Sequence, residues 1–243
     1  MATPGQAESR QKSSRPRPVA LAVHGAGGGG WEFQLWRGHF EAAGWRVLAP
    51  DLKAAAAGLE ATTLADYLVP LRRHARQHPP QLLLGASLGG LLALLLAEHC
   101  PDAGVVLINP LPPAPLAAQL PARDWPARVT WAQRHDLRGT RRALAGADAA
   151  SVWYANQRWR DDSGAVLREA HAGVALVSAP KRSLLISGTR DDSVPIEVQR
   201  ALAAQLGAER LELPDADHLD PLLGGSAHRS AQAALAWAGH RLP

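Results

Sequence analysis

Short continuous apolar runs alternate along most of the chain with longer stretches whose apolar residues recur at helical spacing. Continuous runs bounded by glycine or proline are typical of strands buried on both faces of a parallel sheet. Such runs lie at 18–25, 45–51, 81–85, 103–110, 181–188 and 210–215. The helical stretches lie at 27–44, 62–78, 88–99, 196–207 and 226–242. This alternation predicts an α/β fold with a mostly parallel sheet flanked by helices.

The alternation stops after Pro110 and resumes only near residue 181. Between about 111 and 178 the sequence is rich in proline, then in charged residues and tryptophan, and it has no strong strand pattern. An insertion of this length inside an otherwise regular sheet is typical of a lid rather than of a second independent domain. We therefore expect one domain over 18–243 that carries a lid at about 111–178, preceded by a disordered basic tail over 1–17.

Composition and charge narrow the class of protein. The chain has 243 residues, of which 47% are hydrophobic, and this suits one domain with a substantial core. The formal net charge is +4, but the basic residues are scattered outside the stretch 10–17, so we expect no nucleic-acid partner. No apolar run reaches the roughly 18 residues of a membrane span and no signal peptide is evident, so a cytoplasmic protein is expected. Cys100 is the sole cysteine and the histidines lack metal-site spacing, so we expect no disulfide, metal or cofactor.

The pentapeptide Gly85-Ala86-Ser87-Leu88-Gly89 lies between a predicted strand and a predicted helix. A nucleophilic serine on such a sharp turn has a strained backbone, and side chains two residues before and after it would collide with the adjacent elements. Glycine at both positions removes that collision, and the following helix N-terminus offers N–H groups to an oxyanion. The alternative is an ordinary N-cap serine after a glycine turn. The context of this elbow makes Ser87 a candidate nucleophile.

Residues 23–31, here called the glycine loop, follow the first predicted strand with the sequence VHGAGGGGW. An oxyanion needs two preorganised N–H donors, and one of them can come from this loop. Ala26 or Gly27 is the candidate for the first donor, and Leu88 for the second. A phosphate-binding loop is disfavoured, because no GK[ST] follows and the glycines do not fit GxGxxG. His24 is expected to pack or hydrogen-bond beneath the loop.

Two further segments place acid and base candidates after late strands. Asp191 and Asp192 follow the strand at 181–188, and His218 lies in the loop after the next strand. The chain order is therefore serine, aspartate and histidine, each at the carboxyl end of a strand, where ligands bind in open parallel sheets. Together with the elbow and the glycine loop, this order favours nucleophilic catalysis over a simple helix cap.

With these motifs the chain resembles the α/β-hydrolase fold superfamily of esterases, lipases and non-haem perhydrolases. The resemblance covers about 19–110 and 180–243, and the lid between them is unmatched. It implies Ser87 as the nucleophile, His218 as the general base and Asp191 as the acid. Asp191 is preferred because the family's pattern places the acid three residues after a glycine and shortly before Val-Pro. The sheet starts at the family's third strand, which implies an N-terminally shortened version of the fold.

The sequence departs from the family at Asp217, where a small residue often precedes the histidine. Asp192 is expected to point away from the histidine and to cap the helix that follows. If Asp191 is not the acid, the remaining candidates are Asp192 or, within the lid, Asp124 or Asp136.

The resemblance implies a serine hydrolase that acts on a small-molecule acyl substrate, a carboxylic ester or thioester, through an acyl-enzyme. We expect a monomer or homodimer without a cofactor. A serine nucleophile disfavours haloalkane dehalogenation, whereas perhydrolase and hydroxynitrile-lyase chemistry use a similar triad and stay open. From a different class, the alternative is a hydrolase-fold binding protein with little turnover.

The lid holds a large share of the aromatic residues, namely Trp125, Trp131, Trp153, Tyr154 and Trp159. Arg158 and Arg160 lie beside them in the sequence. The tryptophans pin a small helical cap onto the sheet, or they line an aromatic acyl pocket with arginines near its mouth, and both roles are compatible. For substrate contacts we expect Trp153 and Trp159 of the lid and Gly27 of the glycine loop.

Overall fold

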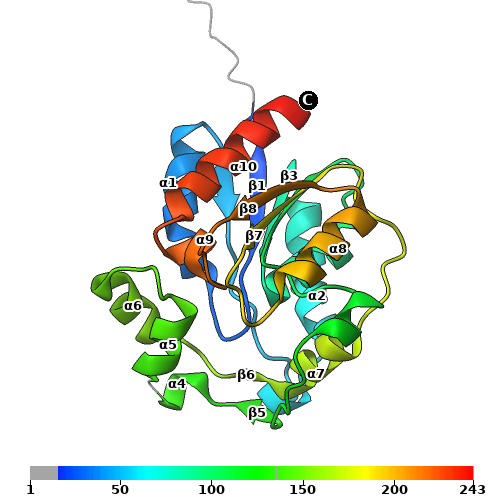
Figure 1. Ribbon diagram of the computed structural model, residues 1–243. Helices are drawn as coiled ribbons and strands as arrows, with labels where there is room; N and C mark the ends of the chain where they lie inside the picture. Colours follow the sequence, from blue (N-terminus) through cyan, green and yellow to red (C-terminus); the bar gives the residue numbers. More distant parts are fainter. Residues whose placement is uncertain (1–15, 135, 243) are drawn as a thin grey trace, which may run out of the picture.

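The computed structural model of the protein describes residues 16–134 and 136–242 (Figure 1). Its main sheet has the strand order β2-β1-β3-β4-β7-β8, and every neighbouring pair is parallel. The strands are β1 (Val19–Val23), β2 (Arg46–Leu48), β3 (Leu82–Ala86), β4 (Gly104–Ile108), β7 (Ser183–Gly188) and β8 (Glu209–Leu213). The prediction of a mostly parallel α/β sheet is confirmed. Residues 1–15 of the predicted tail lie outside the described residues.

The register brings the carboxyl ends of neighbouring strands to one edge of the sheet. Val23 of β1 pairs with Gly85 of β3, and Ala86 of β3 pairs with Ile108 of β4. Strands β1, β3 and β4 are buried almost throughout, as their continuous apolar sequences predict. Loops that leave this edge are therefore carried by the buried centre of the sheet.

Helices cover both faces of the sheet (Figure 1). On one face lie α2 (Leu64–Gln77), α3 (Leu88–Ala97) and α8 (Ile196–Leu206), whose apolar side chains join one core cluster. On the other lie α1 (Gln34–Ala42), α9 (Asp220–Leu223) and α10 (Ala227–Arg241), which pack around the buried Trp36 and Phe40. The 3-10 helices η1 (Gly30–Phe33) and η2 (Leu59–Ala61) complete this part of the fold.

Helices α2 and α3 differ in pattern because they differ in burial. All ten residues of α3 are buried, so it is hydrophobic on every side. Helix α2 is amphipathic and begins with a capping box, in which Thr63 and Asp66 bond each other's backbone N–H groups.

The predicted lid segment contains only short elements. They are η3 (Leu116–Gln119), β5 (Arg128–Val129), α4 (Trp131–Arg134), α5 (Leu137–Ala143), α6 (Ala149–Asn156), β6 (Asp162–Ser163) and α7 (Gly164–Ala172). Strands β5 and β6 form an antiparallel pair. Figure 1 shows α4, α5, β5 and β6 crossing one end of the sheet, at the bottom of the view. Val166 and Ala170 of α7 join the core cluster of α2 and α3, so this end of the segment packs as part of the main helical layer.

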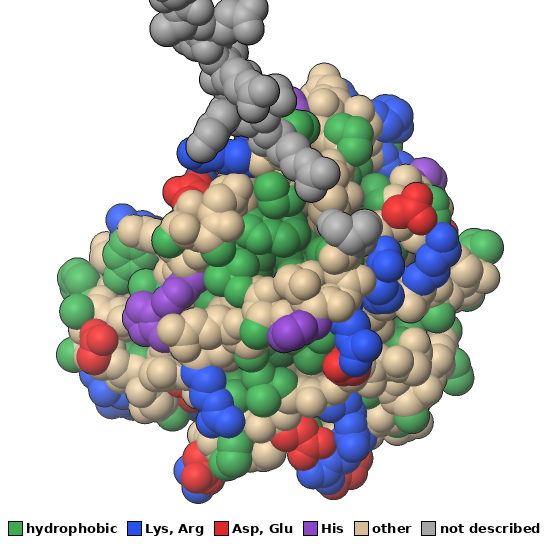
Figure 2. All heavy atoms as spheres, turned by 90° about the horizontal axis from the view of Figure 1, so that it is seen from above, with side chains coloured by type: hydrophobic (Ala, Val, Ile, Leu, Met, Phe, Trp, Pro, Cys, Tyr) green, Lys and Arg blue, Asp and Glu red, His purple; other side chains and the backbone are tan. Residues whose placement is uncertain are grey.

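The opposite end of the molecule carries charges of both signs. Figure 2 shows Lys and Arg side chains at separate places on this face, with Asp and Glu side chains near them. In the described part of the chain, no helix is long and apolar enough to cross a membrane.

Candidate active site

Ser87 lies at the turn between β3 and α3 with φ 53° and ψ −121°, a conformation that residues with a side chain rarely adopt. Its backbone N–H donates to the carbonyl of Ile108 at 3.0 Å, which fixes the turn to β4. A Cβ on Gly85 would lie 2.4 Å from the Gly89 carbonyl oxygen, and one on Gly89 would lie 2.0 Å from that of Val23. Close packing therefore requires glycine at both positions, as the sequence predicts.

The structure brings Ser87, His218 and Asp191 together in a hydrogen-bonded chain. The Nε2 atom of His218 lies 2.9 Å from Ser87 Oγ, and its Nδ1 atom lies 2.7 Å from Asp191 Oδ2. In this arrangement Nδ1–H donates a hydrogen bond to the carboxylate, and Nε2 accepts a hydrogen bond from the serine hydroxyl. The three residues follow β3, β7 and β8, which run parallel to one another in the same sheet.

Asp191 holds the histidine from a fully buried position. Its Oδ1 atom accepts the backbone N–H groups of Ser193 at 2.8 Å and Val194 at 3.0 Å, which leaves Oδ2 for His218. Burial by itself lowers the pKa of His218, but the charge and hydrogen bond of Asp191 outweigh it and raise that pKa above its ordinary value. The environment therefore favours proton uptake by the imidazole.

The expectation that Asp192 caps the next helix is wrong. Helix α8 begins at Ile196 with Pro195 as its N-cap residue, and no side chain caps it. Asp192 lines the cavity instead, where its Oδ1 atom accepts the Ser193 hydroxyl at 3.4 Å. The turn that follows β7 is held by Asp191, whose carboxylate takes the two free N–H groups.

Asn109, which the sequence did not single out, connects the loops of the acid and the base. Its Nδ2 atom donates to the carbonyl of His218 at 2.7 Å, and its Oδ1 atom accepts the N–H of Gly188 at 2.8 Å. Asp217 is turned away from the imidazole, because its Oδ1 and Oδ2 atoms accept the N–H groups of Asp220 and Ala145. Asp217, where the sequence departs from the family, therefore bonds the loop of His218 to the start of α9 and to Ala145 of the lid.

The glycine loop is tied on both sides of Ala26. The N–H of Gly25 donates to Glu32 Oε2 at 3.0 Å, and that of Gly27 donates to Asp162 Oδ2 at 2.7 Å. Ala26 lines the cavity and Gly27 does not. Leu88 occupies the first position of α3, where the N–H has no partner within the helix. The geometry therefore favours Ala26 over Gly27 as the partner of Leu88 in binding an oxyanion.

His24 lies beneath the loop and is buried. Its Nδ1 atom donates to the Gly25 carbonyl at 2.7 Å, and its Nε2 atom accepts the N–H of Leu52 at 2.9 Å. Burial lowers its pKa to about 4, so the ring is neutral at neutral pH. The expected hydrogen-bonding role of His24 beneath the loop agrees with these contacts.

Glu32 is a buried carboxyl that the sequence did not reveal. It is 1% exposed and lines the cavity beside the glycine loop. Burial raises its pKa to about 7, although the Gly25 hydrogen bond and the charges of His218 and Arg160 act in the opposite direction. A glutamate within an amphipathic helical stretch ordinarily lies in solvent, so no sequence signal marked it.

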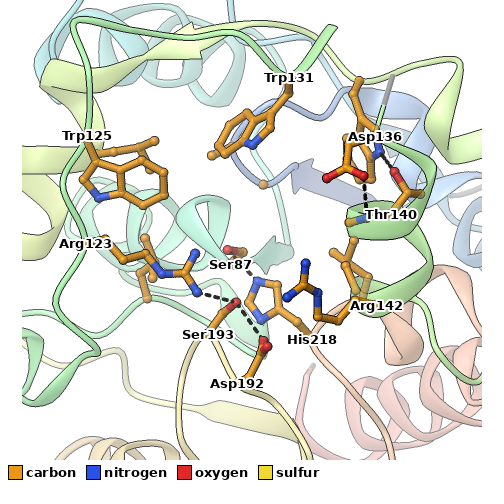
Figure 3. A pocket seen from close by; sticks show the side chains of 18 of the residues that line it. Ser87, Arg123, Trp125, Trp131, Asp136, Thr140, Arg142, Asp192, Ser193 and His218 are labelled. Atoms are coloured by element: carbon orange, nitrogen blue, oxygen red, sulfur yellow. Dashed lines mark hydrogen bonds between the residues drawn. The ribbon is translucent and has the colours of Figure 1, made fainter. Parts of the chain in front are cut away.

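A cavity of about 430 Å³ opens above Ser87 and His218 (Figure 3). Its walls include the indoles of Trp125, Trp131 and Trp159. In Figure 3, Arg123 and Trp125 lie on one side of Ser87, and Thr140 and Arg142 lie on the other. The cavity is therefore aromatic on its lid side and carries charged groups on two opposite sides.

Of the three residues expected to contact substrate, one lines this cavity and two do not. Trp159 lines it, but Trp153 is 58% exposed and lies outside its lining, and Gly27 is covered by the lid. The arginines at the cavity are also different from those expected. Arg158 packs over the ring of Tyr154, and Arg160 bonds the glycine loop, whereas Arg123 and Arg142 reach the cavity. The sequence pattern of the lid did not show which of its side chains face the cavity.

Within residues 16–134 and 136–242, no group of three or more His, Cys, Asp or Glu side chains is arranged to hold a metal ion.

Comparison with known proteins identifies relatives of this chain. The model of a family described as "Alpha/beta hydrolase family" matches residues 20–234. A pyrethroid hydrolase from Sphingobium faniae JZ-2 is 23% identical, with 92% of this chain and 98% of that chain covered and a TM-score of 0.68. Tomato methylketone synthase I, complexed with 2-tridecanone, is 19% identical, with 93% and 100% covered and a TM-score of 0.72. At these identities the two structures show a shared fold alone.

A curated relative matches a shorter segment. Norfluorocurarine synthase 1 from Strychnos nux-vomica is 35% identical over 89 residues, which are 34% of this chain and 34% of the relative. The match therefore spans about a third of the length of that protein.

Proposed function

Since this chain belongs to the α/β-hydrolase family, we propose that it is a serine hydrolase that cleaves a carboxylic ester or thioester through an acyl-enzyme on Ser87. The observation that carries the proposal is the hydrogen-bonded chain from Ser87 Oγ through His218 to Asp191, with distances of 2.9 and 2.7 Å. The strained turn at Ser87 and the cavity above it support the same reading, because they expose the hydroxyl to a ligand.

In the proposed acylation step, His218 Nε2 takes the hydroxyl proton while Ser87 Oγ forms a bond to the acyl carbon. The carbonyl electron pair moves to oxygen, and the N–H groups of Ala26 and Leu88 bind the resulting oxyanion. When the carbonyl re-forms, the bond to the leaving alcohol or thiol breaks, and His218 gives that group its proton. Asp191 orients the imidazole and stabilises its cation throughout.

In the proposed deacylation step, His218 takes a proton from water as the water oxygen bonds to the acyl carbon. The second oxyanion forms at the same place and collapses with release of Ser87 Oγ, which recovers the proton from His218. The carboxylic acid then leaves. Glu32 lines the cavity near this position, and burial raises its pKa to about 7, which reduces the negative charge that it places beside the oxyanion.

The cavity suggests a substrate of moderate size with an apolar, planar or branched group. Trp125, Trp131 and Trp159 offer flat apolar walls, and a volume of about 430 Å³ lies within the range of small-molecule sites. The pyrethroid hydrolase and the methylketone synthase share only the fold, so their substrates are not carried over to this chain. A panel of p-nitrophenyl esters and thioesters with straight-chain, branched and aryl acyl groups tests the preference.

A fluorophosphonate probe tests the proposed function directly. We expect rapid stoichiometric labelling of Ser87, and both labelling and ester turnover should be lost in Ser87→Ala while the melting temperature stays nearly unchanged. The melting temperature is the control, since the change removes one hydroxyl at a turn. Labelling at another serine would contradict the assignment, and an unlabelled but ligand-binding wild-type protein would favour the binding-protein alternative.

A further inference from the structure

Three residues of the lid enclose Gly27, the neighbour of the proposed oxyanion donor Ala26. The N–H of Gly27 donates to Asp162 Oδ2 at 2.7 Å, and its carbonyl accepts the N–H of Arg160 at 2.7 Å. A Cβ on Gly27 would lie 2.3 Å from the indole of Trp131. Both backbone polar groups of Gly27 are therefore bonded to the lid, and Asp162 is 135 residues away in the chain.

Asp162 itself is fixed from several directions. It is 4% exposed, and its Oδ1 atom accepts the hydroxyl of Tyr67 at 2.6 Å and the N–H of Ser163 at 2.7 Å. A buried carboxylate that accepts three hydrogen bonds is held in place, because movement would break at least one of them. Tyr67 belongs to α2, so Asp162 joins the lid, the glycine loop and the helical layer.

Arg160 adds a second connection to the same loop. Its Nε atom donates to the Gly28 carbonyl at 2.6 Å, and a terminal nitrogen lies 3.4 Å from Asp51. Glycine residues leave a loop with large conformational freedom, so a loop of this sequence needs anchors to hold one N–H in a fixed direction. The structure supplies these anchors from Glu32 on one side of Ala26 and from the lid on the other.

We propose that Asp162 and Arg160 are positioning residues through which the lid fixes the glycine loop, and thereby the oxyanion donor Ala26. The inference rests on the proposed function of the site. It gives the lid a part in turnover besides covering the substrate, since Trp131 contacts Gly27 on one side and lines the cavity on the other.

Asp162→Ala tests the proposal, with Asp161→Ala as the matched control. Asp161 is the adjacent carboxylate of the same segment, but it bonds Arg128 and the N–H of Ala132, which both belong to the lid. A displaced oxyanion donor affects the transition state more than the bound ester. We therefore expect Asp162→Ala to lower kcat about 10- to 100-fold with KM within about threefold of wild type, and Asp161→Ala to leave kcat unchanged.

The affinity for an arylboronic acid distinguishes a positioning role from a purely structural one. His218 Nε2 takes the hydroxyl proton as Ser87 Oγ bonds to boron. The adduct is a tetrahedral boronate anion, one oxygen of which occupies the oxyanion position. The affinity for this inhibitor should fall in Asp162→Ala by about the same factor as kcat. Arg160→Met, whose side chain is partly exposed in the native protein, is the second variant, and it should lower both quantities about tenfold even if Asp162→Ala fails to fold.

The outcomes separate this inference from the proposed function. Wild-type protein that shows neither Ser87 labelling nor boronate binding would overturn the proposed function itself. Ser87-dependent turnover that is unchanged in folded Asp162→Ala or Arg160→Met would overturn only the positioning role. An equal loss of kcat in Asp161→Ala, or a change confined to KM with unchanged boronate affinity, would overturn it as well.

Discussion

Glu32→Gln should change how the free energy of unfolding depends on pH. The folded protein holds the Glu32 proton up to a pKa of about 7, whereas the ordinary value for this carboxyl is 4.5. Between these two values the folded state binds more protons than the unfolded state, so wild-type stability falls as pH rises. Glutamine has the same shape and still accepts the N–H of Gly25, but it does not ionise.

The magnitude follows from the displacement of the pKa. At about 1.36 kcal/mol for each pKa unit, the ionised Glu32 lowers the stability of wild type by about 3 kcal/mol at pH 8 relative to pH 4.5. The carboxyl interacts with Arg160 and Asp162 from the lid and with His218 from the loop after β8, and burial outweighs the interactions that lower its pKa. We therefore expect the free energy of unfolding of Glu32→Gln, relative to that of wild type, to rise by about 3 kcal/mol between pH 4.5 and pH 8.

Urea unfolding of both proteins at several pH values between 4.5 and 8 measures this difference. The difference between variant and wild type cancels the titrating groups that do not interact with Glu32. Glu60→Gln is the control, because it removes an exposed glutamate from η2, and its difference should stay within about 0.5 kcal/mol at every pH. A Glu32→Gln difference that varies by less than about 1 kcal/mol over the interval would refute the reasoning.

The remaining predictions concern the proposed triad. Asp191→Asn should keep the N–H bonds of its turn but present an amide N–H to His218 Nδ1, which stabilises the wrong tautomer and lowers turnover up to about 10⁴-fold. Asp192→Asn should change ester hydrolysis little, because its 3.4 Å contact with the Ser193 hydroxyl survives the change, and the reverse ranking would move the acid to Asp192. His218→Ala should cost several orders of magnitude in kcat and His24→Ala less, and equal losses in two folded proteins would contradict their separate roles.

The sheet and the elbow were predictable because their causes are local in sequence. A strand buried on both faces must be apolar at every position, and a strained turn packed between two elements needs glycine on both sides, so both leave a readable pattern. The order of serine, aspartate and histidine also placed each candidate at the edge of the sheet where the structure has it. What the sequence could indicate, therefore, was the set of loops that meet at one edge.

The lid and the buried polar groups were not predictable in the same way. Trp153 and Trp159 lie six positions apart in one aromatic stretch, yet only Trp159 faces the cavity, because the lid elements are short and their orientation depends on distant contacts. Asp192 was expected to cap a helix because it stands near a helix start, but the N-cap position of α8 is Pro195, three residues further along the chain. Asn109 forms hydrogen bonds to residues 79 and 109 positions away in the chain, and no local sequence pattern predicts such bonds.

The glycine loop depends both on its local sequence and on contacts with distant segments. Its sequence explains why the backbone can approach Ser87 closely, since a Cβ on Gly25 would already lie 3.3 Å from the Ser87 Cβ. The same glycines leave the loop without side chains of its own to hold it, so its rigidity must come from elsewhere. Glu32 from the start of the first helical segment and Asp162 from the lid each take one N–H beside Ala26. Two buried carboxylates at such a place are unfavourable for the proposed oxyanion, and the raised pKa of Glu32 and the neighbouring Arg160 both reduce that cost. Two buried carboxylates from outside the glycine loop thus supply the anchors that its own residues lack.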